Sequence, residues 1–331
     1  MGAASYPLGS TYDEAGDVLT QSYPDGETIA NSYTPEGWLS GVTTTKNGTT
    51  TTLASGLAYT GVGGAFGELT AMHLGGGYDY SATYDTLDRA TDLKTKRTSD
   101  GTTLFDQNRT FDGAGNVSTA QTTMPAGSDN QAFCYDEQDR LTWSSSATAT
   151  PPCGGGNTAG TLTAAQYTQA FTYDVMGRLA TGPLGSYAYG SAAHVHAATS
   201  IGTTWTAAYD AAGNMTCRAP SPSSTCAGTP TGAQLGYNNE GELMAWQNAP
   251  TSPSTTASFL YRGDGQRVAQ AVTSGSTTTT TVYVGGVEEV ATSGATTTTT
   301  AYYYAGGKRI GLSVNGTVSY LASDGLGSAN V

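Results

Sequence analysis

The chain is poor in charged residues, and cations are scarcer than anions. Lys and Arg together number 13 against 26 Asp and Glu, so the formal net charge of the 331 residues is −13 at pH 7. Nucleic acids are held mainly by clustered Lys and Arg, and this balance therefore argues against a nucleic-acid partner. The longest apolar stretches are also far short of the roughly 20 residues that span a bilayer. We expect neither nucleic-acid binding nor a membrane span.

The short motifs that carry common chemistries are missing as well. No G-x-S-x-G elbow, H-E-x-x-H helix or Walker loop occurs. Glu288 and Glu289 are neighbours, and on a strand their carboxyls would point to opposite faces, a poor arrangement for an acid and a base acting on one bond. His194 and His196 would share one face of a strand, but no acidic or cysteine ligand lies near them. We expect no catalytic residue, no metal, no cofactor and no enzymatic activity.

Only four cysteines are present, and they form two local pairs, Cys134 with Cys153 and Cys217 with Cys226. Three pairings are possible, but closing each local loop needs the least rearrangement, and each bond would constrain the unfolded chain by about 2 to 4 kcal/mol. Disulfides imply an oxidising compartment. A zinc site would need closer cysteine spacing and histidine partners, and free buried thiols are the third alternative.

No segment has sustained helical periodicity, whereas one seven-residue pattern recurs along the chain. It reads Y-D-x-x-G-x-L, an aromatic residue followed by a tight-turn sequence and, six positions after the aromatic, usually an apolar side chain. Tyr59 begins a further, degenerate copy that keeps Gly63 and Ala65. Nine clear copies begin at Tyr12, Tyr33, Tyr84, Phe111, Tyr135, Tyr173, Tyr209, Tyr237 and Tyr261.

The tetrad inside each copy predicts a β-hairpin corner, because Asp first and Gly fourth suit a type I turn followed by a left-handed residue. Asp88 and Asp139 replace that glycine, which is tolerable because Asp enters the left-handed region more readily than most residues. The aspartates fit turn capping better than a calcium loop. The clearest turn positions are Asp13 and Gly16, Asp112 and Gly115, Asp174 and Gly177, and Asp210 and Gly213.

Threonine-rich runs and Asn-Gly turns predict strands between these corners. Asn47-Gly48 and Asn315-Gly316 are strong hairpin signals. We expect an all-β fold of one continuous body, in which 1–272 is the repeat region and 273–331 contains Thr-rich hairpins and a distinct ending. A single hairpin is marginally stable, so neighbouring hairpins must bury the recurring aromatic and Leu or Val side chains, and the repeat aromatics are predicted to be core residues.

The copies at Tyr135 and Tyr173 closely resemble the YD repeats of the RHS/YD-repeat family, and the resemblance covers nearly the whole chain. The ending from Tyr302 to Ser328 is similar to the start of the RHS-associated core. Gly325 stands where the family often has histidine in a D-H-L-G-S stretch, so any role of that histidine is lost here. The family includes bacterial polymorphic toxins, insecticidal toxin complexes and teneurins.

This resemblance implies a β-strip that spirals into part or all of a hollow shell. The first hypothesis is a non-catalytic segment of a secreted or cell-surface bacterial shell, with an enclosed C-terminal toxin or other polypeptide and adjoining shell segments as its partners. The second is a self-assembling extracellular fibre subunit, a homopolymer that pairs through open terminal strand edges. The third is an adhesin that binds a glycan or receptor. Bacterial toxin relatives continue into a self-cleaving aspartyl protease segment, and the sequence ends before it, so no autoprotease residue is assigned.

Overall fold

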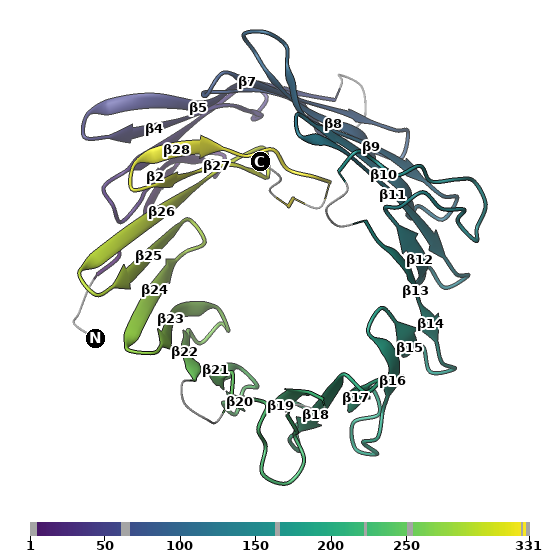
Figure 1. The fold of residues 1–331 in the computed structure, drawn as a ribbon. Helices are drawn as coiled ribbons and strands as arrows, with labels where there is room; N and C mark the ends of the chain where they lie inside the picture. Colours follow the sequence, from purple (N-terminus) through teal and green to yellow (C-terminus); the bar gives the residue numbers. More distant parts are fainter. Residues whose placement is uncertain are drawn as a thin grey trace. The chain divides into compact units, whose positions relative to one another are not determined.

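The computed structural model describes residues 5–60, 67–162, 166–221, 224–249, 254–325 and 327–328. Every element in these ranges is a β-strand, and consecutive strands are antiparallel neighbours wherever their register is described (Figure 1). The all-β prediction is confirmed. The turn after Tyr59, with Gly63 and Ala65, lies outside the described residues.

The strands form two sheets, each in strict sequence order. The first contains β1 (Gly9–Tyr12), β2 (Val18–Ser22), β3 (Thr28–Tyr33), β4 (Leu39–Lys46), β5 (Thr49–Tyr59), β6 (Leu69–Leu74), β7 (Tyr78–Tyr84), β8 (Ala90–Arg97), β9 (Thr103–Phe111), β10 (Val117–Met124), β11 (Gly127–Tyr135), β12 (Leu141–Ser145) and β13 (Thr168–Ala170). The second contains β14 (Thr172–Tyr173), β15 (Leu179–Gly182), β16 (Gly185–Ala188), β17 (Ser200–Ile201), β18 (Trp205–Tyr209), β19 (Met215–Pro220), β20 (Ala233–Tyr237), β21 (Leu243–Gln247), β22 (Thr255–Tyr261), β23 (Arg267–Ser274), β24 (Thr277–Val284), β25 (Glu288–Ser293), β26 (Thr296–Ala305), β27 (Lys308–Val314) and β28 (Thr317–Tyr320).

The chain divides into two compact units. Unit 1 comprises Met1–Thr168, Val284–Glu288 and Thr299–Val331, and unit 2 comprises Gln169–Tyr283 and Glu289–Thr298. The division into 1–272 and 273–331 that we expect from the sequence describes types of repeat rather than compact units, so it stays a prediction.

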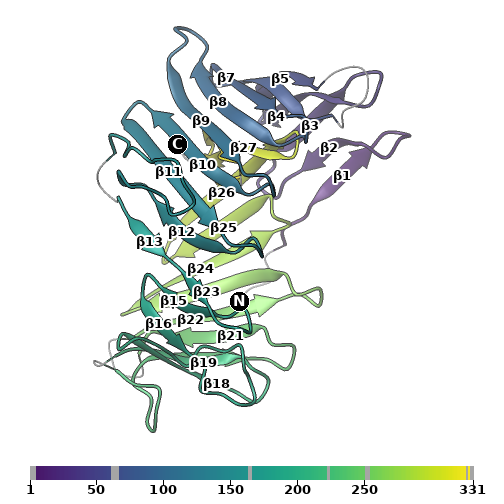
Figure 2. The same ribbon diagram turned by 90° about the vertical axis from the view of Figure 1, so that its right-hand side faces the viewer.

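Unit 1 has two layers, because its C-terminal strands return onto the N-terminal ones. In both views β27 lies against the sheet formed by the N-terminal strands (Figure 1, Figure 2). The Tyr320 hydroxyl lies 3.4 Å from the carbonyl oxygen of Thr52, and its ring packs 6.1 Å from that of Tyr78. The buried cluster between the layers joins residues from both ends of the chain, among them Val42, Leu53, Leu93, Phe105, Tyr303 and Ile310.

The Thr-rich runs and the Asn-Gly signals occupy the places that the sequence predicts. The runs lie in β4, β5, β24 and β26. Asn47 and Asn315 have φ values of 51° and 49°, the left-handed conformation that a two-residue hairpin loop requires. Across β4 and β5 the hydroxyls of Thr45 and Thr50 are 2.8 Å apart, one of several threonine pairs between neighbouring strands.

Candidate functional site: the repeat corner and its tyrosine clamp

Each repeat forms a five-residue turn that closes on itself. In the first copy the Asp13 amide donates to the Asp17 carbonyl at 3.0 Å, and the Gly16 amide donates to the Asp13 carbonyl at 3.2 Å. The same two bonds recur at Asp112, Asp174 and Asp210. They recur again near the C-terminus, where the Asp324 amide donates to the Ser328 carbonyl at 3.0 Å and the Gly327 amide donates to the Asp324 carbonyl at 3.1 Å.

The first aspartate caps the turn with its side chain. Asp13 Oδ1 accepts hydrogen bonds from the amides of Ala15 and Asp17, both at 2.9 Å. This is the local bonding that makes Asp a turn residue. In three copies the last turn residue is an arginine that binds the other carboxylate oxygen, Arg89 to Asp85, Arg140 to Asp136 and Arg178 to Asp174. The arginine hydrogen bonds hold the pKa of Asp85 and of Asp136 below its ordinary value.

The fourth turn residue is left-handed in each of the nine clear copies. Gly16, Gly115, Gly177 and Gly213 have φ values of 93°, 100°, 76° and 90°. Asp88 and Asp139 adopt 57° and 59°, as expected for aspartates that replace this glycine.

The aromatic residue and the sixth residue after it are direct cross-strand partners, which explains their fixed spacing. Tyr12 pairs with Val18, Tyr33 with Leu39, and Phe111 with Val117. The strand register shifts at each of these pairs, so every corner also carries a β-bulge.

A recurring hydrogen bond links many of the corners to the preceding one. The Tyr33 hydroxyl donates to the carbonyl of Val18, the cross-strand partner of Tyr12. We call this bond, from a tyrosine hydroxyl to the partner of the preceding aromatic, the tyrosine clamp. It recurs from Tyr59 to Leu39 (2.8 Å), Tyr84 to Leu69 (3.0 Å), Tyr135 to Val117 (3.1 Å), Tyr189 to Leu179 (2.8 Å) and Tyr261 to Leu243 (3.1 Å), and Tyr209 makes a similar bond to Ala198 (2.8 Å).

One position in the series lacks a hydroxyl because its aromatic residue is Phe111. There the guanidinium of Arg109 donates to the Ala90 carbonyl at 2.7 Å, and Ala90 is the cross-strand partner of Tyr84. Arg109 thus supplies the bond that a tyrosine makes elsewhere. Its guanidinium also occupies the space beside Gly325, where an added Cβ would come within 1.8 Å of Nη1. A histidine at position 325 would therefore require the Arg109 guanidinium to move.

The sequence predicts that the repeat aromatics are core residues. In the structure they are less buried than the residues of the hydrophobic clusters, and Tyr84 packs against one of those clusters. None of the nine is fully buried: eight are partly exposed, and Tyr12 is 59% exposed. The reason is that each ring lies at a corner, and in five of the nine copies the hydroxyl is directed to a neighbouring backbone carbonyl. Burial raises the pKa of Tyr59, Tyr84 and Tyr135, so these hydroxyls stay protonated and able to donate.

The four cysteines are bonded as local pairs. Cys134 is joined to Cys153, and Cys217 to Cys226, with Cα–Cα distances of 5.8 and 5.7 Å. Cys134 in β11 and Cys217 in β19 are both 2% exposed. Each bond therefore fastens a loop to a buried strand position.

Glu288 and Glu289 are neighbours in the sequence, but their side chains differ in burial. Glu288 is 1% exposed and lies near Asp25, whereas Glu289 is half-buried. The contact joins residues 263 apart in the chain, so no local pattern could have revealed it. His194 and His196 lie in a loop rather than on a strand, and the His194 ring lies against Gly213. Among the described residues no group of three or more His, Cys, Asp or Glu side chains is arranged to hold a metal ion.

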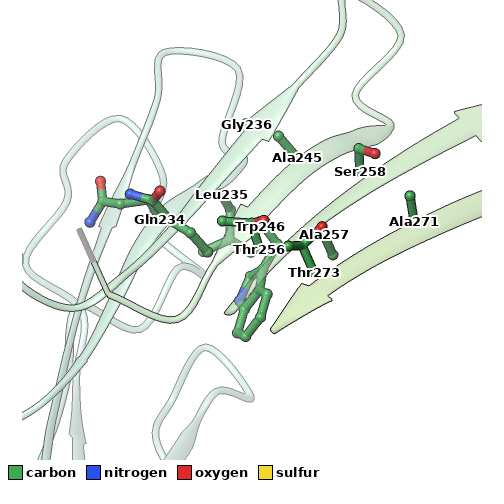
Figure 3. A pocket seen from close by; sticks show the side chains of 11 residues that line it. Gln234, Leu235, Gly236, Ala245, Trp246, Thr256, Ala257, Ser258, Ala271 and Thr273 are labelled. Carbon is green, nitrogen blue, oxygen red and sulfur yellow. The ribbon is translucent and has the colours of Figure 1, made fainter. Parts of the chain in front are cut away.

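A shallow groove of about 410 Å³ crosses strands β20 to β23 in unit 2. Its lining includes the small residues Gly236, Ala245, Ser258 and Ala271 beside the larger side chains of Leu235 and Trp246. Figure 3 shows the indole of Trp246 and the methyl of Ala245 directed to opposite faces of the strand, as strand alternation requires. No Asp, Glu, His, Lys or Arg lines the groove, so its chemistry is limited to hydrogen bonding and apolar contact.

Comparisons with solved structures relate the fold to that of bacterial toxin components. The chain is similar to part of the Photorhabdus luminescens Tc holotoxin pore structure, with a TM-score of 0.73 and 19% identity over 98% of this chain and 17% of that one. It is equally similar to a TcdB2–TccC3 crystal structure, with a TM-score of 0.74 and 19% identity over 100% of this chain and 18% of that one. The chain thus spans less than a fifth of the length of these chains.

Identity at this level shows a shared fold. Neither a protein-family model nor a curated protein sequence matches the chain. The part of the chain that the structure describes also holds no helix long and apolar enough to cross a membrane.

Proposed function

We propose that the chain is a non-catalytic wall segment of a secreted RHS-type shell that encloses or presents a C-terminal polypeptide outside a bacterial cell. The tyrosine clamp carries this proposal. It recurs within both units, joins several hairpin corners to the preceding ones and uses backbone carbonyls as acceptors, so in the proposed wall it links successive hairpins without creating a reactive site. The fold shared with Tc toxin components supports the same reading.

The sheet edges suit a wall that continues into adjoining segments. Within the described residues β1 pairs only with β2, and all four of its residues are exposed. An open edge of this kind accepts another strand. In the proposed shell that strand comes from the same polypeptide.

Intact mass of the protein from its native source, with and without reductant, tests this proposal first. A mass well above 33.7 kDa supports a wall segment of a larger polypeptide. Limited proteolysis of that polypeptide then tests enclosure. We expect a C-terminal fragment that survives in the wild type and is degraded in a Tyr84→Phe/Tyr135→Phe variant, which lacks two clamps. The matched control is Tyr12→Phe, because Tyr12 is exposed and no clamp bond is described for it. Equal degradation in wild type and variant would refute enclosure.

The exposed β1 edge also favours a second candidate, the self-assembling fibre. In this case the native mass is near 33.7 kDa and electron microscopy reveals filaments. Ser10→Lys should abolish the filaments, because a lysine on an edge strand opposes pairing. Filaments that persist in this variant would exclude β1 as the pairing edge.

A further inference from the structure

Three carboxyl groups meet where the β2–β3 corner touches the returning C-terminal strands of unit 1. Asp25 and Glu27 belong to the turn between β2 and β3, and Glu288 begins β25. Glu27 is 4% exposed and Glu288 is 1% exposed. Burial this complete is unusual for ionisable side chains, which normally remain at the surface unless they are paired.

Hydrogen bonds satisfy one carboxylate oxygen of Glu27 and leave the other without a described partner. Glu27 Oε1 accepts hydrogen bonds from the Thr44 hydroxyl and, at 2.8 Å, from the Tyr303 hydroxyl. Glu27 Oε2 is buried and has no described partner. Glu288 Oε2 accepts one bond, from the Asp25 amide at 3.3 Å.

The charges in the cluster do not balance when all its carboxyls are ionised. Lys46 on β4 faces the cluster and forms an ion pair with Asp25. Arg309 donates to the Tyr304 hydroxyl at 3.0 Å. The remaining titratable groups around the cluster are the phenols of Tyr23, Tyr303 and Tyr304. Burial raises the pKa of Tyr23 and Tyr303, so both phenols are neutral. Among the described residues neither Glu27 nor Glu288 has an ion-pair partner of its own, and both side chains are buried.

We propose that Glu27 and Glu288 form a proton-dependent latch between the β2–β3 corner and strands β25 and β26. A proton on Glu288 removes a buried charge and creates a donor. The layers are held together at the same place by the Tyr23 hydroxyl, which donates to the Tyr302 carbonyl at 2.9 Å. The latch is independent of the proposed shell function, because it depends only on the contact within unit 1.

The direction of the pH effect follows from the pKa of Glu288. Burial, and after it the charge of Asp25, raises this pKa above its ordinary value of 4.5. The folded state therefore binds the proton more tightly than the unfolded state does. The stabilisation is fully present below the unfolded pKa and is lost as pH rises through the folded pKa. Acid closes the latch, and a rise in pH loosens it.

The test compares the full chain with its Glu288→Gln variant in urea unfolding between about pH 5 and pH 8. In the wild type the unfolding equilibrium constant should rise by up to tenfold per pH unit for one proton released. In Glu288→Gln that pH dependence should flatten, and the variant should be the more stable protein at the alkaline end. Glu289→Gln is the matched control on the same strand, and its profile should follow the wild type.

Asp92 is a second carboxyl that contributes to the pH dependence of global unfolding, so hydrogen exchange is used to locate the effect of Glu288. Burial also raises the pKa of Asp92, so the comparison is repeated in an Asp92→Asn background. Exchange is then measured in peptides covering Tyr23–Thr28 and β26. At equal pH these peptides should exchange more slowly in Glu288→Gln than in wild type at the alkaline end, whereas peptides from β10 should not differ. The same pH slope in wild type and Glu288→Gln, or an equal effect of Glu289→Gln, would overturn the latch.

Discussion

The hydroxyl of a single clamp tyrosine is the smallest feature that links neighbouring repeats. Tyr135→Phe removes the bond to the Val117 carbonyl and leaves the ring in place. We expect the free energy of unfolding to fall by about 1 kcal/mol, the net contribution of a typical hydrogen bond. Urea denaturation measures it.

Tyr12→Phe is the control for this change, because the Tyr12 side chain is 59% exposed. We expect its effect to lie within about 0.5 kcal/mol of zero, as for other surface changes. If the two variants lose the same stability, the Tyr135 bond adds nothing to the fold.

Arg109 and Phe111 should be energetically coupled if Arg109 replaces a missing tyrosine clamp. Arg109→Gln should lower stability by roughly 1 to 3 kcal/mol, because the guanidinium donates a charge-assisted bond to Ala90. Adding Phe111→Tyr should restore about 1 kcal/mol by supplying the hydroxyl. A double-mutant cycle measures the coupling. If Phe111→Tyr had the same effect in the wild type and in the Arg109→Gln variant, Arg109 would not be the replacement for a tyrosine clamp.

The corner could be predicted from the sequence, but the clamp could not. Asp13 and Gly16 carry local information, because capping and a left-handed φ are properties of five consecutive residues. The acceptor of the clamp is a backbone carbonyl, which leaves no mark in the sequence. The fixed interval between Tyr12 and Val18 was the available signal, since it shows that the two residues pair across the strands. Glu288 gave no such signal, because its contact with Asp25 exists only after the C-terminal strands return.

At the scale of the hairpin, two glycines in one turn distinguish the effect of a left-handed backbone from the effect of adding a side chain. Gly115 has a φ of 100°, which side-chain-bearing residues rarely adopt, whereas Gly113 is not left-handed and has open space at its Cβ position. Gly115→Ala should lower the free energy of unfolding by about 1 to 2 kcal/mol.

Gly113→Ala should instead be neutral or raise stability by up to about 1 kcal/mol, because alanine restricts the unfolded chain. Thermal unfolding of both variants, with the wild type alongside, measures the difference. Equal destabilisation by the two substitutions would show that the turn is sensitive to any side chain rather than to φ.

At the scale of the whole molecule, the two compact units differ in how much apolar surface they bury. Both clusters of buried hydrophobic residues in the described chain lie in unit 1. In unit 2 the buried hydrophobic residues among those described are Cys217, Ala219 and Ala269. Since fully burying one large apolar side chain contributes about 1.5 to 3 kcal/mol, unit 1 has much the larger stabilising term.

This contrast predicts that unit 2 opens before unit 1. Native-state hydrogen exchange should show lower protection in β16 to β22 than in β5 to β9, with opening free energies that differ by several kcal/mol, as expected when local stability follows buried contacts. Reducing the Cys217–Cys226 bond should lower protection around β19 further and leave β7 to β9 unchanged, because the bond fastens a loop of unit 2 alone. The two units would instead be one cooperative body if all strands opened with the same free energy, and then the clamps, which recur in both units, would outweigh the difference in burial.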